Sequence, residues 1–267
     1  MRLTESDIEQ ATLDWLSGLG WAIAHGPDMA PEGKAPERAS YGDVLLLGRL
    51  KAALARINPQ LPPDTIDDIV RKIVAAEMPS LVEENRRLHK LLVDGVAVQY
   101  MQADGTIKND IAWLIDWTNQ KNDWLAVNQF TIIEERNNRR PDILLFVNGL
   151  PLGVIELKNA GDENATIDGA FRQVQAYKQL IPSLFRTNGV LLISDGLKAR
   201  IGSLTADFER FMPWRTVDGT NIAPKGTPEL HTIIHGVCDQ RFFLEMIRRF
   251  TVFQSNGKDV FKIITVG

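Results

Sequence analysis

Apolar positions recur at helical spacing in several parts of the chain, with charged residues between them. The pattern predicts helices over residues 4–19, 43–57, 62–77, 79–95 and 167–181, and two more around 229–250. Thr4 can cap the first helix, with Asp7 at the third helical position, and Gly95 ends the fourth. Residues 26–42 combine Pro, Gly and mixed charge, which indicates a loop.

Between these helices the pattern changes to short runs of β-branched and aromatic residues bounded by turn signals. Strands are expected over residues 21–25, 96–101, 124–133, 142–147, 151–158, 189–196 and 199–204, with a pair of short strands near the end of the chain. The run at 189–196 is nearly all apolar, as in a strand covered on both faces. Together these elements predict an α/β or α+β domain with a helical insertion near 43–94.

The composition is that of a globular protein without a membrane segment. At 267 residues, of which 44% are apolar, the chain can form one large domain or two small ones. No apolar run approaches the roughly 20 residues that span a bilayer, and the N-terminus lacks the apolar segment of a signal peptide. The single cysteine, Cys238, excludes an internal disulfide and a cysteine-rich zinc site. We therefore expect a cytoplasmic protein.

One stretch, RPDILLFVNGLPLGVIELKN at residues 140–159, combines two apolar runs with three charges. Asn148-Gly149 is a strong hairpin signal, although Leu150-Pro151 can lengthen the loop. For a turn centred anywhere in 148–151, residue 142 falls opposite residues 155–157. Asp142 and Glu156 then lie side by side, and Lys158, two residues after Glu156, points to the same face.

Two carboxylates and one ammonium at one spot suit a magnesium site. Mg²⁺ takes oxygen ligands, usually one or two carboxylates, so Asp142 and Glu156 are candidate ligands with the Leu157 carbonyl as a third. A metal-bound water becomes a nucleophile near neutral pH, and Lys158 can orient it, deprotonate it or neutralise charge on a phosphate. The alternative is an exposed ion pair worth about 0–1 kcal/mol. The apolar surroundings of Glu156 favour the metal site, because a buried charge needs a partner.

Further polar residues are candidates for the same site. Gln173 and Tyr177 are four apart on a predicted helix, so both can face a phosphate, a metal-bound water or a base, although such a pair is also common in packing. Glu9, on the first helix, can supply another carboxylate.

A basic spot lies in the sequence just before Asp142. The net charge of −4 is not that of a protein that grips nucleic acid over its whole surface, so any DNA contact must be local or belong to another subunit. Arg136, Arg139 and Arg140 are candidate phosphate contacts for such a local site.

These residues resemble the PD-…-E-x-K nucleases, through Pro141-Asp142 and Glu156-Leu157-Lys158. The longer context is similar to the N-terminal domain of the motor (R) subunit of type I restriction endonucleases. The stretches that carry this resemblance are NRRPDILLFVNGLPLGVIELKN, DENATIDGAFRQVQAYK, INPQLP (57–62), PSLVEENRRLHKLLVDGV (79–96), NQFTI (128–132), LLISDGLKARIGSLTA (191–206) and FMPWRT (211–216). The resemblance implies an α/β fold with a mixed β-sheet flanked by helices, built around a restriction-endonuclease-like core.

The resemblance also implies roles for the candidate residues. Asp142 and Glu156 correspond to metal ligands, Lys158 to the catalytic lysine, and Gln173 and Tyr177 to a Q-x-x-x-Y motif. Glu9 matches an N-terminal acidic position of this nuclease type. The implied activity is that of a type I site-specific deoxyribonuclease, with Mg²⁺-dependent hydrolysis of double-stranded DNA without sequence preference at the cut. Methyltransferase and specificity subunits are the implied partners.

The resemblance assigns all of residues 1–267 to one nuclease domain. Its core is expected at about 1–25 and 96–210, its helical insertion at about 43–94, and a helical and linker segment at about 211–267 that leads to a translocase. The sequence contains no GxxxxGK[ST] phosphate loop, so ATP, which full-length members of the family require, is not expected to bind here. A non-catalytic docking module, or a repair or junction-resolving nuclease with the same motif, remains an alternative.

Overall fold

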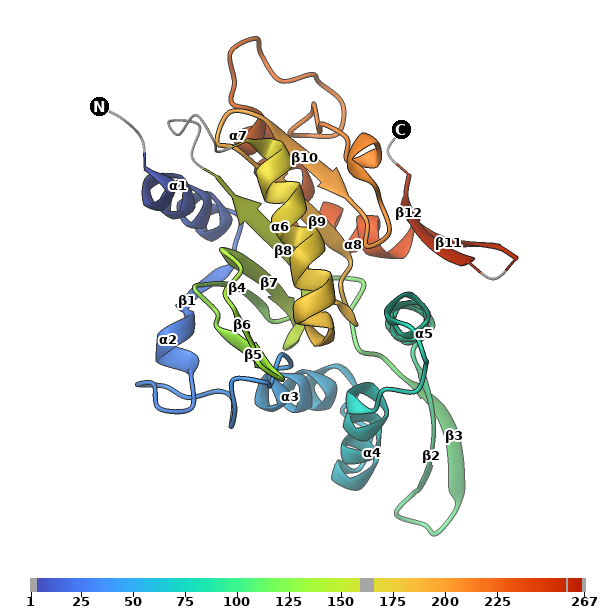
Figure 1. Ribbon diagram of the computed structural model, residues 1–267. Helices are drawn as coiled ribbons and strands as arrows, with labels where there is room; N and C mark the ends of the chain where they lie inside the picture. The colour runs from blue at the N-terminus through green and yellow to red at the C-terminus, as the bar shows by residue number, and fades with distance from the viewer. Residues whose placement is uncertain (1–3, 159–165, 258, 266–267) are drawn as a thin grey trace.

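A six-stranded mixed sheet forms the centre of the molecule, with the strand order β1-β4-β7-β8-β9-β10 (Figure 1). The structure is a computed structural model that describes residues 4–158, 166–257 and 259–265. Residues 162–165, the first four of the stretch DENATIDGAFRQVQAYK, lie outside the described ranges. The strands of this sheet are β1 (Ala22–His25), β4 (Trp124–Asn128), β7 (Ile143–Val147), β8 (Leu150–Leu157), β9 (Val190–Ser194) and β10 (Ala199–Gly202). β1 and β4, and β8 and β9, are parallel, and the other neighbours are antiparallel. The expected fold class is confirmed.

Helices cover both faces of this sheet. They are α1 (Glu5–Gly18), α2 (Gly26–Met29), α3 (Leu47–Ile57), α4 (Pro63–Val74), α5 (Leu81–Asp94), α6 (Ile167–Leu180), α7 (Glu229–Val237) and α8 (Gln240–Arg248), with 3-10 turns η1 (Pro182–Phe185) and η2 (Phe208–Arg210). Thr4 and Asp7 form the predicted capping box of α1, and Gly95, with φ of 78°, ends α5 as predicted. Within the described ranges, no helix is both long and apolar enough to span a bilayer.

Side chains alternate between two cores along the central strands, which explains why these strands are apolar throughout. Ile143, Leu145 and Val147 of β7 pack with residues of α1, α7 and α8, whereas Leu144 and Phe146 pack with α6. α6 crosses its face of the sheet in front of β8 and β9 (Figure 1). Every residue of β7, β8 and β9 is buried, so a charged group there is shielded from water by both layers.

A two-residue turn and a one-residue shift between Leu145 and Phe146 together set the register of the central hairpin. Asn148 and Gly149 have φ of 54° and 79°, as the type I′ turn requires. Leu150 therefore begins β8, and the longer loop through Pro151 does not form. The same turn explains a second difference from the prediction: the Leu46 N–H donates to the Gly149 carbonyl at 2.9 Å, so residues 43–46 pack under the hairpin and α3 begins only at Leu47.

Three further expectations need correction. The segment predicted as one strand over 124–133 is broken at Gln129, whose φ of 55° ends β4 before the short hairpin of β5 (Ile132–Glu134) and β6 (Asn137–Arg139). The loop predicted over 26–42 begins with the short helix α2. β2 (Val96–Met101) does not join the main sheet but pairs with β3 (Ile107–Ala112), a strand that its many polar residues concealed. Figure 1 shows this hairpin beside the helical insertion, away from the main sheet.

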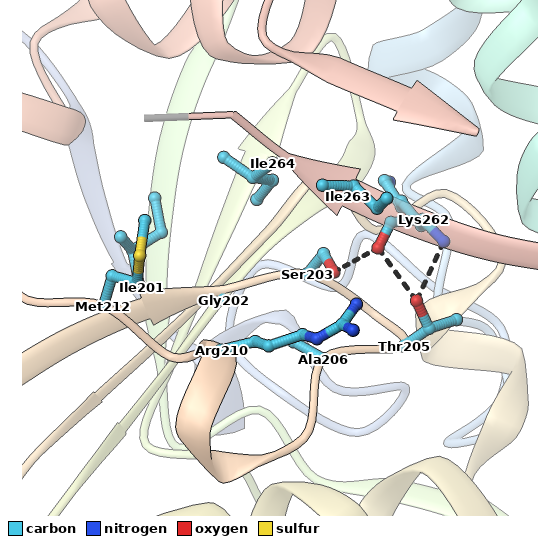
Figure 2. A pocket seen from close by; sticks show the side chains of 10 residues that line it. All are labelled: Ile201, Gly202, Ser203, Thr205, Ala206, Arg210, Met212, Lys262, Ile263 and Ile264. Carbon is cyan, nitrogen blue, oxygen red and sulfur yellow. Dashed lines mark hydrogen bonds between the residues drawn. The ribbon is translucent and has the colours of Figure 1, made fainter. Parts of the chain in front are cut away.

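The C-terminal hairpin consists of β11 (Thr251–Asn256) and β12 (Asp259–Ile264). It is hydrogen-bonded to the segment that follows β10. Figure 2 shows the pocket between them, where the Lys262 carbonyl accepts hydrogen bonds from Ser203 Oγ at 2.5 Å and Thr205 Oγ1 at 2.8 Å. The buried Lys262 ammonium donates to Asn85 Oδ1 of α5 at 3.1 Å. These contacts tie the end of the described chain to both the sheet and the helical insertion.

Substitution of Gly149 tests the register-setting turn. A Cβ at this position would collide with the Leu46 carbonyl oxygen as well as strain the backbone, so Gly149→Ala is expected to lower the free energy of unfolding by roughly 3 kcal/mol. Gly105→Ala is the matched control, because Gly105 also has positive φ but has open space around it; it should cost only about 1 kcal/mol. Equal losses in urea unfolding would contradict the account of this turn.

Candidate active site

The pairing of β7 with β8 places Asp142 beside Glu156. Ile143 pairs with Ile155 in this antiparallel ladder, so the next residues outward, Asp142 and Glu156, oppose each other. Since Ile143 and Ile155 face the core under α1 and α7, the alternation of side chains turns the two carboxylates toward the face that α6 covers. The structure thus brings together the two acids that the sequence singled out.

Asp142 is held in place by the chain of the opposite strand. The Leu157 N–H donates to Asp142 Oδ2 at 2.6 Å. Burial raises the pKa of Asp142 to about 6, although this hydrogen bond and the positive charge of Lys158 act in the opposite direction. A carboxylate that burial destabilises in its charged form is favourably placed to take a cation.

Glu156 is the more strongly perturbed acid. Its side chain is fully buried, and its Oε1 accepts a hydrogen bond from Lys158 Nζ at 2.8 Å. Its Oε2 has no hydrogen-bond partner among the described residues. Burial, and then the charge of Asp142, raise the pKa of Glu156 to about 8. An unpartnered carboxylate oxygen in a buried site is stabilised either by a proton or by a cation.

Lys158 completes this group of charges. Besides Glu156, its Nζ donates to the Leu157 carbonyl at 3.1 Å, and it lies 3.8 Å from Glu5 Oε1 of α1. Burial lowers the pKa of Lys158, but the charges of Glu156 and Asp142 outweigh this effect and leave the pKa raised. The ammonium therefore stays protonated near neutral pH.

α6 contributes two polar side chains over the carboxylates. Gln173 Nε2 donates to Tyr177 Oη at 2.6 Å, and Tyr177 Oη donates to the Arg140 carbonyl at 3.5 Å. Burial, and then the charge of Glu156, raise the pKa of the Tyr177 hydroxyl. The hydroxyl therefore remains a hydrogen-bond donor at neutral pH, close to Glu156.

α1 contributes acids from the other side. Glu9 accepts hydrogen bonds from Asn128 Nδ2 at 2.7 Å and from Gln129 Nε2 at 2.9 Å, and its negative charge helps to raise the pKa of Asp142. The left-handed conformation of Gln129 turns its side chain toward Glu9 and lets its N–H donate to the Asp142 carbonyl. Backbone strain of this kind often marks a functional site.

Sequence reasoning missed three of these participants. Glu5 carried a signal, because it lies one turn before Glu9 on the same helix. Asn128 and Gln129 belong to the stretch NQFTI, which contributed to the family resemblance, but no role was assigned to them because both fell inside a run that was predicted to be a continuous strand.

The predicted arginines separate into two places. Arg139 and Arg140 line an open hollow beside α6, whereas Arg136 lies in the exposed turn between β5 and β6 and does not line it. The hollow also contains Arg172 of α6, which the sequence analysis did not single out.

The donors present fit a magnesium ion. In the part of the chain that the structure describes, no group of three His, Cys, Asp or Glu side chains gathers into a metal cluster. The available donors are therefore the carboxylates of Asp142 and Glu156 with the carbonyl of Leu157. Mg²⁺ takes such hard oxygen donors and keeps several waters, and the unpartnered Oε2 of Glu156 is a free ligand atom.

Comparisons with known proteins identify relatives. Residues 2–210 match the family described as "Type I restriction enzyme R protein N terminus". The chain is 41% identical to the type I restriction enzyme HindI endonuclease subunit of Haemophilus influenzae, over 98% of this chain and 25% of that protein. It is 28% identical to the type I restriction enzyme EcoprrI endonuclease subunit of Escherichia coli, over 81% of this chain and 70% of that protein. The chain thus spans about a quarter of the length of the first relative.

The raised pKa values predict how stability depends on pH without metal. Both acids bind protons more tightly in the folded protein than in the unfolded chain, so their contribution to stability is present below about pH 4 and is lost as the pH rises through about 6 and 8. In EDTA, the free energy of unfolding of wild type should therefore fall between pH 5 and pH 8. The fall should be smaller for Glu156→Gln, by more than about 1 kcal/mol.

Urea unfolding at the two pH values measures this difference. The control is Glu209→Gln, which removes an exposed glutamate and should leave the pH profile of wild type unchanged. If the two variants show the same profile, the account of Glu156 as a strained buried acid is wrong.

Proposed function

Because this chain belongs to the family of type I restriction enzyme R protein N termini, we propose that it is a Mg²⁺-dependent nuclease domain. It hydrolyses phosphodiester bonds of double-stranded DNA without sequence preference at the cut. The observation that carries this proposal is the pairing of half-buried Asp142 with fully buried Glu156, with Lys158 in contact, at the end of the central hairpin. Two carboxylates with a nearby cation are suited to hold a divalent ion against a phosphate.

Asp142, Glu156 and the Leu157 carbonyl hold the ion in this proposal. When bound, Mg²⁺ supplies Lewis acidity toward a phosphoryl oxygen and lowers the pKa of water. The Leu157 N–H orients Asp142 through its hydrogen bond to Oδ2. The same peptide segment thus fixes one ligand by its N–H and offers another by its carbonyl.

Lys158 acts as a cation rather than as a base. Without a metal ion, its raised pKa keeps the ammonium charged near neutral pH, which favours the role of a cation. Its hydrogen bond to Glu156 points Nζ into the site, where it can orient the attacking water and neutralise charge that builds on the phosphate.

Tyr177 and Glu9 support this arrangement from two sides. The Tyr177 hydroxyl, held by Gln173, can donate to a phosphate oxygen. Glu9, fixed by two amide donors, offers a carboxylate that can accept hydrogen bonds from water around the ion. Arg139 and Arg140, which line the hollow beside α6, are the candidate contacts to the DNA backbone. Arg136 lies outside the hollow, so it can contact the backbone only from the exposed turn between β5 and β6.

The chain works as one part of a larger restriction enzyme in this proposal. Methyltransferase and specificity subunits recognise the DNA sequence, and an ATP-driven translocase of the full-length subunit moves the DNA. The enzyme acts in the cytoplasm, where its DNA substrate is found.

A second candidate function is that of a non-catalytic docking module. It is favoured by the β2–β3 hairpin, which exposes the apolar side chains of Met101, Ile107 and Ile111. Incubation of the chain with supercoiled plasmid and Mg²⁺, first alone and then with partner subunits and ATP, separates the two. The net charge of −4 leads us to expect little cutting by the chain alone. A complex that cuts equally well with an Asp142→Asn chain would favour docking.

Metal binding is testable without any cutting. Mg²⁺ at about 100 times its dissociation constant should stabilise the wild-type chain by about 2.7 kcal/mol, seen as a rise in Tm. Asp142→Asn and Glu156→Gln remove a ligand charge and should abolish most of this rise. Glu209→Gln should respond like wild type. A rise of equal size in all four proteins would place the ion elsewhere.

Cutting by the complete enzyme tests the catalytic assignment. Asp142→Asn, Glu156→Gln and Lys158→Ala each remove a group that acts on the phosphate or its metal, so each should slow DNA cutting by about 100-fold or more. ATP hydrolysis and translocation should continue at the wild-type rate. Full cutting by any of the three variants refutes the assignment.

A further inference from the structure

An open hollow rich in arginine lies beside the carboxylates. Eight residues from β6, the segment after it, and α6 line the hollow: Asn138, Arg139, Arg140, Gly169, Arg172, Gln173, Ala176 and Tyr177. Figure 1 shows β6 and α6 next to each other on this side of the sheet. Three of the eight are arginines, in a chain whose net charge is negative, so positive charge is concentrated locally.

We infer that this hollow seats a second phosphate, about two nucleotides along the DNA strand from the phosphodiester at Asp142 and Glu156, with Arg172 as its main contact. The inference rests on the proposed nuclease function. It assigns a positioning role to Arg172, which holds the strand and does not touch the reacting atoms.

The hollow is continuous with the carboxylate site through Tyr177. This residue lines the hollow, and its hydroxyl donates to the carbonyl of Arg140, two residues before Asp142. Arg172 is five residues away on the same helix, which corresponds to about 7.5 Å along the axis. Phosphates follow one another along a DNA strand at about 3.4 Å of helix axis. A strand that passes from Tyr177 to Arg172 therefore brings a nearby phosphate into the hollow.

The face of α6 has the shape that a backbone contact needs. Arg172 and Gln173 lie three and four residues after Gly169, and Ala176 lies four and three residues after them, so the four share one face. Gly169 and Ala176 are small, and among the described atoms beyond its chain neighbours and its own helix backbone, the nearest to a Cβ built on Gly169 is Thr166 Oγ1 at 3.7 Å. The small residues leave room for the sugar-phosphate chain, while Arg172 and Gln173 provide donors at its side.

Charge makes an arginine contact necessary at this point. The two carboxylates, with Glu5 and Glu9 nearby, form an acidic centre that repels a phosphodiester until a cation is bound. Guanidinium groups bind phosphate in a bidentate manner and keep their charge at all relevant pH values. Arg140 also links the hollow to the site, since its carbonyl accepts the hydrogen bond from Tyr177.

The test is made in the complete restriction enzyme, with cutting, translocation and subunit assembly measured separately. Arg172→Ala should slow cutting about tenfold at physiological salt, the loss expected for one charged hydrogen bond. Arg172→Lys keeps the charge and should restore most of the rate. In a plot of the logarithm of the cutting rate against the logarithm of the salt concentration, the slope for Arg172→Ala should be shallower than that for wild type by about one unit. The reason is that one phosphate contact is gone.

Arg241→Ala is the matched control, because it removes one exposed arginine on α8 that does not line the hollow; it should cut like wild type. Wild-type cutting and salt slope in Arg172→Ala overturn the inference. Loss of assembly or translocation together with cutting also overturns it, because the hollow would then bind an acidic segment of a partner subunit. The proposed function fails separately, if Asp142→Asn still cuts.

Discussion

The antiparallel register between β7 and β8 is the constraint on which the rest of the site depends. The turn at Asn148 and Gly149 starts the pairing, and a one-residue shift between Leu145 and Phe146 then moves it so that Ile143 pairs with Ile155 and Asp142 lies against Glu156. A slip by one residue would turn one carboxylate to the opposite core. Both cores are tightly filled with apolar side chains, so such a slip would bury a charge among hydrocarbon, and the packing of the sheet opposes it.

Burial also destabilises the charged forms of Asp142 and Glu156. Glu156 is fully buried, and only one of its two oxygens is satisfied, by Lys158. The single ammonium offsets only part of the charge that the site carries once both acids are ionised. A fold that maximised its own stability would place apolar residues here. In the proposed function, these two acids with only one ammonium beside them are the feature that a divalent cation binds.

Local sequence signals predicted the parts of the structure that neighbouring residues determine. The capping box at Thr4, the end of α5 at Gly95 and the Asn148-Gly149 turn each depend on residues a few positions apart. The family resemblance and the mixed sheet were confirmed by the family match and by the strand order. What the sequence did not reveal depends on contacts between distant segments. Glu9 contacts Gln129 only in the folded chain, and Arg172 and Arg139, from two different elements, line the same hollow.

The central claim is that Asp142, Glu156 and the carbonyl of Leu157 together form the binding site of a divalent cation. The most direct measurement is anomalous diffraction from crystals of this protein soaked in Mn²⁺, which takes the same oxygen ligands as Mg²⁺ and scatters strongly. The account predicts a peak at about 2.0–2.3 Å from an oxygen of each of the two carboxylates. Saturating Mn²⁺ that leaves this position empty, or a peak bound only by other residues, would contradict it.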